Sequence, residues 1–264
     1  MWNAHPRLVR TLEGLLLSLG FLSVLCAGAG AAEVRGFAMV SAHTYEGYTR
    51  TIQADGSYVP ETYAFGNGGR WDIAMVDKTI DDLSFIEIGR TIAGPLADQG
   101  YLPAKDPRST KLLIVVYWGT SSGSAEAPQF KIPTMTGNYV VGAMAEVNDT
   151  LNARMLGFEM PNRADSFKHD PLNLLEEVEA NRYFVGLVAY DFQALWRHNV
   201  RKVLWVTRYS IREHRNQFDV ALPEMTKYAA QFFGQDSHGF VARKLPEGHV
   251  DVGPSKILGT EGER

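Results

Sequence analysis

The motif that best fits catalytic chemistry is the pentapeptide GTSSG at Gly119–Gly123, which matches the G-x-S-x-G pattern of serine hydrolases. In those enzymes the central serine sits on a tight turn between a strand and a helix. Asp170 and His198 follow Ser121 in the chain order of a hydrolase triad. The next residues, SAEAPQFKIP, do not begin a helix promptly, so the motif lacks its usual context. A small serine hydrolase centred on Ser121 is therefore kept as an alternative function.

A second group of candidates lies on one predicted strand, at Trp205, Arg208, Tyr209 and Arg212. If these aromatic and basic side chains shared an exposed face, they could bind an anionic or glycan ligand. Aromatic residues on strands more often pack in a core or on a sheet face, and we favour that interpretation.

The sequence predicts neither a metal site nor a bound cofactor. The histidines after residue 32 are scattered, without an H-E-x-x-H motif or a helical pair. The glycine-rich stretch Gly66–Gly69 lacks the Lys and Ser/Thr of a phosphate-binding loop, so we interpret it as a turn.

Residues 1–32 have the three parts of a secretory signal peptide: Arg7 and Arg10, the apolar stretch Gly14–Ala27, and the small residues AGAGAA. The apolar stretch is shorter than the roughly 20 residues of a membrane-spanning helix. We predict cleavage near Ala31 or Ala32, and hence a periplasmic or secreted protein. Lipidation at Cys26 ranks second, because Leu25 is too large for the small residue that lipoprotein processing favours.

Cleavage would remove the single cysteine, so the mature chain could not form disulfides or thiolate sites. It would also remove two Arg and one Glu from the 26 basic and 30 acidic residues, leaving 24 and 29, a net charge of −5. With this charge and no basic block, we expect no nucleic-acid partner. We also expect no transmembrane segment after the signal peptide, because no later apolar stretch is long enough.

Strands are predicted where apolar residues run continuously or alternate, and helices where they recur every three or four residues. The predicted strands are 34–43 and 57–65, at an edge or in a hairpin, with 111–118, 183–190 and 202–212. The predicted helices are 81–99, capped by Asp81 or Asp82, and 216–233, capped by Asn216 or Asp219.

Between the strands at 111–118 and 183–190, we interpret residues 119–181 as an insertion of loops and helices. Its helical patterns cover 139–156 and 172–181. Residues 241–264 have few apolar positions and are predicted to be a mobile tail. The fold predicted for 33–240 is one α+β domain, a mixed or mainly antiparallel sheet with helices on one face and this helical insertion.

Several segments together resemble the bacterial envelope family catalogued as domain of unknown function 4136. They are TYAF, ADQGY, VVYWG, VAYD, VLWVTRYS and FDVALPEMTKYAAQFFGQDSHG, within residues 58–118 and 182–240. The resemblance implies one sheet domain with helices packed on it, in a small exported or lipid-anchored protein, and offers no catalytic residues to carry over. This chain departs from the family in its long insertion and in lacking a convincing lipoprotein cleavage motif.

The function expected from the sequence is non-enzymatic. We expect an envelope-associated interaction or scaffold protein that uses the insertion or the open face of the sheet. The alternatives are the hydrolase centred on Ser121 and a binding protein for a small envelope ligand. The expected partner is accordingly an envelope protein or a small molecule.

Overall fold

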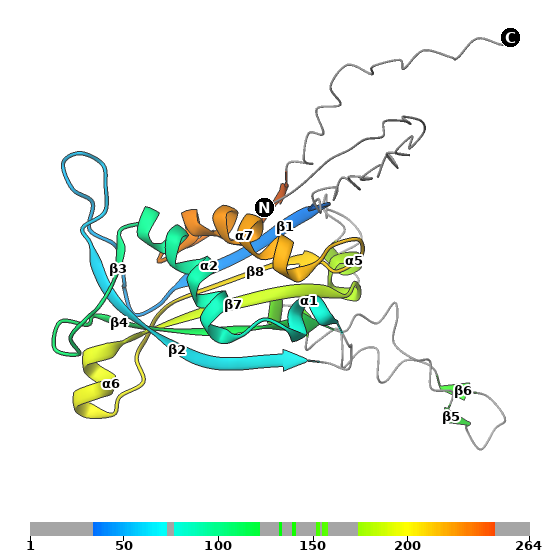
Figure 1. The fold of residues 1–264 in the computed structure, drawn as a ribbon, viewed down its shortest axis with the longest axis horizontal. Coiled ribbons are helices and arrows are strands. Elements are labelled where there is room, and N and C mark those ends of the chain that lie inside the picture. The colour runs from blue at the N-terminus through cyan, green and yellow to red at the C-terminus, as the bar shows by residue number, and fades with distance from the viewer. Residues whose placement is uncertain are drawn as a thin grey trace, which may run out of the picture. The chain divides into compact units, whose positions relative to one another are not determined.

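The fold is a single seven-stranded mixed sheet with helices on both of its faces (Figure 1). The computed structural model describes residues 34–72, 77–121, 132–133, 139–140, 152–153, 155–157 and 174–245. The signal peptide predicted at 1–32 lies outside the described residues, as does Asp170. In the part of the chain that is described, no helix is long and apolar enough to cross a membrane.

The seven strands follow the order β3-β2-β4-β7-β8-β1-β9 across the sheet. Strand β2 pairs in parallel with β3 and β4, and all other neighbours are antiparallel. The predicted α+β class with a mixed sheet is confirmed. The strands span Phe37–Thr44 (β1), Glu61–Asp72 (β2), Tyr101–Pro103 (β3), Leu112–Ser121 (β4), Arg182–Asp191 (β7), Val203–Arg212 (β8) and Phe240–Lys244 (β9).

Three helices cover one face of this sheet: α1 (Lys78–Asp81), α2 (Phe85–Asp98) and α7 (Phe218–Ala229), the last continued by the 3-10 turn η2 (Ala230–Phe232). Apolar side chains of α2 and α7 meet those of the central strands in one buried core, which includes Ile92, Met225, Val185 and Trp205. Burial of this core is the main source of stability, because each fully buried large apolar side chain contributes about 1.5–3 kcal/mol.

The helix boundaries differ from the sequence expectation because none of the predicted residues caps α2 or α7. Ser84 caps α2 in a reciprocal capping box with Glu87, and Gly100 follows its end with a φ of 77°. Helix α7 starts after Gln217, which makes no side-chain cap bond. Asn216 does not cap α7, because its side-chain oxygen accepts a hydrogen bond of 2.8 Å from the Arg35 N–H instead.

The face opposite α1, α2 and α7 is called the distal face here, and it carries the part of the insertion that the structure describes. Helix α5 (Leu174–Glu179) and the helical residues 152–153 and 155–156 contribute Val178, Ala153 and Leu156 to a second buried cluster. This cluster packs against Met39 and Phe184 of the sheet. Residues 139–140 were expected to be helical but form β6 (Tyr139–Val140), which pairs with β5 (Ile132–Pro133).

Two further expectations are wrong, namely a mobile tail that begins at residue 241 and an edge position for the first strands. Residues 241–244 are not a mobile tail, because β9 pairs antiparallel with β1 and Leu245 after it is buried. Strand β1 is consequently an interior strand between β8 and β9, and β2 is interior between β3 and β4, so neither has the predicted edge or hairpin position. The rest of the predicted tail, 246–264, lies outside the described residues.

Candidate functional site

The predicted triad is not assembled in the structure. Ser121 is the last residue of β4, where it is fully buried and its Oγ accepts a hydrogen bond of 3.1 Å from the Arg182 N–H. His198 ends α6 (Phe192–His198), which begins next to Asp191. Asp191 pairs with Leu112, nine residues from Ser121 along β4, so the two ends lie about 30 Å apart. The serine is therefore part of the sheet, with its hydroxyl bonded to the neighbouring strand.

The four candidates on β8 do not share one face. Trp205 and Tyr209 are buried in the core beneath the helices. Arg208 and Arg212 project from the distal face, because neighbouring side chains of a strand point to opposite sides of a sheet. Arg212 is bound to Glu177 and Glu176 of α5, which leaves Arg208 as the candidate available to a ligand.

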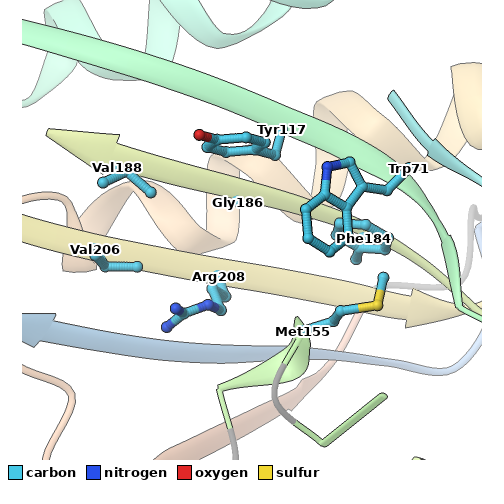
Figure 2. A pocket seen from close by; sticks show the side chains of 8 residues that line it. All are labelled: Trp71, Tyr117, Met155, Phe184, Gly186, Val188, Val206 and Arg208. Carbon is cyan, nitrogen blue, oxygen red and sulfur yellow. The ribbon is translucent and has the colours of Figure 1, made fainter. Parts of the chain in front are cut away.

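A cavity of about 470 Å³ lies on the distal face and is the strongest candidate for a binding site (Figure 2). Its volume is in the range of small-molecule pockets, about 300–1,000 Å³. Four strands of the sheet and one segment of the insertion contribute its lining: Trp71, Tyr117, Met155, Phe184, Gly186, Val188, Val206 and Arg208. Seven of the eight lining residues are apolar or aromatic, and Arg208 alone carries a charge.

Glycines shape this cavity. Gly186 of β7 leaves its floor without a side chain. A Cβ on Gly68 would lie 2.6 Å from the Tyr117 ring, so that ring occupies the space above the glycine. A Cβ on Gly119 would lie 1.7 Å from the carbonyl oxygen of Trp71, with which Gly119 is paired. These glycines let the two aromatic residues reach the cavity.

The glycine stretch Gly66–Gly69 is therefore not the predicted turn. It lies inside β2, with a bulge between Asn67 and Gly69. A turn and a strand that must approach a bulky neighbour both favour glycine, and the sequence does not show which one applies. The same ambiguity affects Gly119. The hydrolase motif would need this glycine for a tight turn, but in the structure it allows a close contact with the backbone of Trp71.

The aromatic side chains at one end of the cavity are arranged edge to face. The ring centroids of Trp71 and Tyr117 are 6.3 Å apart with planes at 83°. Trp71 is 52% exposed, so a large apolar surface stays open to solvent beside the cavity. Phe184 continues this wall toward Met155 of the insertion (Figure 2).

Arg208 is the charged residue of the cavity lining. Burial lowers its pKa from the ordinary value, while the nearby Tyr45 acts in the opposite direction. Its side chain runs beside Gly157, where an added Cβ would lie 3.4 Å from the Arg208 Cδ. Among the residues that the structure describes, Arg208 has no hydrogen bond or ion pair through its guanidinium.

A charged network beside the cavity fixes α5 to the sheet. Arg182 is fully buried, donates to Ser210 Oγ at 3.0 Å and forms an ion pair with Glu177. Burial lowers the pKa of Arg182 to about 10, although the Glu177 carboxylate acts to raise it. Arg212 also donates to Glu177, at 2.8 and 3.1 Å to Oε1 and 3.0 Å to Oε2. The network is satisfied internally and has a structural role.

Metal binding has no support in the described ranges, which hold no group of three or more His, Cys, Asp or Glu suited to a metal ion. His43 instead contacts Asp236, with 2.7 Å between Nδ1 and Oδ2.

Comparison with known proteins gives one structural likeness to report. No family model matches the sequence, and no curated protein matches it. A crystal structure of a DUF4136 family protein from Bacteroides thetaiotaomicron is similar to this chain, with 10% identity and a TM-score of 0.33. The likeness covers 76% of this chain and 95% of that protein. Family membership stays a prediction from the sequence motifs.

Proposed function

We propose that this chain is a non-enzymatic binding protein that holds a small apolar molecule in the distal-face cavity. The observation that supports the proposal is the cavity itself, about 470 Å³ and lined by aromatic and aliphatic side chains from four strands and the insertion. A concave, mostly apolar pocket with a few placed polar groups is the usual form of a small-molecule site.

This proposal selects among the functions expected from the sequence. It favours the small-ligand alternative over a scaffold role, because the distal face is hollowed where the ligand would lie. A hydrolase centred on Ser121 is disfavoured, since that hydroxyl is buried in the sheet and far from His198. We place the protein in the bacterial envelope on the strength of the signal-peptide pattern in residues 1–32.

The test is binding of the neutral fluorescent probe N-phenyl-1-naphthylamine, whose emission rises in apolar surroundings. We expect saturable binding to the wild-type chain. Gly186→Ala should weaken binding slightly and Gly186→Val strongly, because each added methyl group occupies the cavity floor. A Cβ at this position makes only an ordinary contact of 3.9 Å with Tyr117, so the fold should tolerate Gly186→Ala, and an unchanged circular dichroism spectrum is required of the valine variant.

A matched pair of tryptophan variants provides the control. Trp71 and Trp196 are 52% and 50% exposed, but only Trp71 lines the cavity. Trp71→Ala should lower probe affinity several-fold, and Trp196→Ala should leave it unchanged. Equal effects of the two substitutions, or no saturable binding to the wild type, would contradict the proposal.

A further inference from the structure

We propose that the cavity is specific for an organic monoanion with an apolar body, and that Arg208 binds its carboxylate or equivalent anionic group. The inference rests on the proposed function and adds the chemical class of the ligand. Its basis is the position of one cation, which has no acidic partner among the described residues, at the edge of a mostly apolar cavity.

The argument begins with the basic side chains on the distal side of β1, β7 and β8, namely His43, Arg182, Arg208 and Arg212. Arg182 and Arg212 both bind Glu177, and His43 contacts Asp236. Within the described part of the chain, Arg208 is the member of this set that has no acidic partner. Within this set, the described residues therefore compensate every basic group except Arg208, which leaves its positive charge for a ligand.

The surroundings of Arg208 make that charge costly without an anion. Its side chain is partly buried among apolar groups, and burial lowers its pKa. A charge removed from water is stabilised by an opposite charge or by hydrogen bonds to the charged form. A guanidinium suits this purpose because its planar N–H groups can bind a carboxylate through two parallel hydrogen bonds.

The rest of the lining selects against strongly polar ligands. Beyond Arg208 the described walls offer aliphatic side chains and aromatic rings, with the Tyr117 hydroxyl and the Trp71 N–H as their polar groups. A sugar or a polyanion would therefore leave many of its polar groups without partners. One positive charge balances one negative charge. Alkyl and aryl carboxylates both combine one negative charge with an apolar body. The test examines the alkyl and the aryl body separately.

The test compares an acid with its alcohol as competitors for bound N-phenyl-1-naphthylamine at neutral pH. Decanoate against decanol represents the alkyl body, and 2-naphthoate against 2-naphthalenemethanol the aryl body. We expect the acid of the preferred body to bind about 10- to 100-fold more tightly than its alcohol, the range of a charge-assisted hydrogen bond.

Arg208→Met should reduce the acid-to-alcohol preference to about one while the neutral probe still binds, which shows that the variant is folded. Arg208→Lys should keep part of the preference, because it retains the charge without the planar donors. Arg243→Met, at a basic residue of β9 outside the cavity lining, is the control and should keep the full preference.

The outcomes separate the two proposals. Acid and alcohol binding equally well, or a preference unchanged in Arg208→Met, would overturn the anion inference while the binding function stands. No binding of the neutral probe to the wild type would remove the binding function, and the anion inference with it.

Discussion

The buried carboxylate of Glu177 should contribute several kcal/mol to the free energy of unfolding, and the substitution Glu177→Gln tests this directly. Glu177 is the shared acceptor of Arg182, which is fully buried, and of Arg212. Even with this partner present, burial holds the pKa of Arg182 at about 10, below its ordinary 12.5. That difference corresponds to a net cost of about 3 kcal/mol for the charged form, at 1.36 kcal/mol per pKa unit.

Removing the carboxylate charge leaves Arg182 buried and without its counter-ion. We expect Glu177→Gln to lower the free energy of unfolding by about 3–5 kcal/mol, the usual cost of breaking a buried ion pair on one side. This is a large share of the 5–15 kcal/mol that stabilises a typical domain. Arg182→Met should cost less, because Glu177 keeps its bonds to Arg212.

The assay is urea unfolding followed by tryptophan fluorescence, since Trp118 and Trp205 are buried in the core and report its loss. The matched control is Glu176→Gln, the neighbouring carboxylate, which also binds Arg212 but is 55% exposed. An exposed ion pair contributes at most about 1 kcal/mol. If Glu177→Gln costs no more than Glu176→Gln, the reasoning about the buried network is wrong.

Two further predictions concern glycine and capping positions. Gly119→Ala should destabilise the protein by about 1–3 kcal/mol in urea unfolding, because the added Cβ would collide with the Trp71 carbonyl. Gly89→Ala in the interior of α2 should instead stabilise it by about 0.5–1 kcal/mol, because its Cβ would make only ordinary contacts of 3.6 and 3.7 Å with the Phe65 ring. Equal effects of these two changes would contradict the first. Hydrogen bonds from the Ser84 backbone and hydroxyl lower the pKa of Glu87 below its ordinary 4.5. The capping box therefore contributes fully to the stability of the fold above pH 4.5, and this contribution is lost as the pH falls through the lowered pKa. Ser84→Ala removes the hydroxyl bond but keeps the backbone bond, so it should raise the Glu87 midpoint partway in an NMR titration, and its stability deficit should shrink in acid. An unchanged midpoint would show that the Ser84 hydroxyl does not bond Glu87 in solution.

Local pattern was enough to predict much of the fold. The continuous apolar residues of 183–190 and 111–118 predicted the central strands β7 and β4, and apolar spacing predicted the helices that became α2 and α7. These features are visible in sequence because a strand buried on both sides, or a helix with one buried stripe, must repeat apolar residues at the period of its own geometry.

The tertiary structure alone decided the candidate site. Glycines such as Gly66–Gly69 and Gly119 can form turns or can make room for bulky neighbours such as Tyr117 and Trp71. The choice depends on which strands become neighbours, and that pairing brings together residues far apart in the chain. Arg208 was a candidate from its type, but its lack of an acidic partner among the described residues follows from the placement of α5, whose Glu177 serves Arg182 and Arg212 instead. The sequence determines the chemical type of each side chain and the spacing of apolar residues along the chain. The burial and the charge balance of a side chain depend instead on the groups that long-range packing brings beside it.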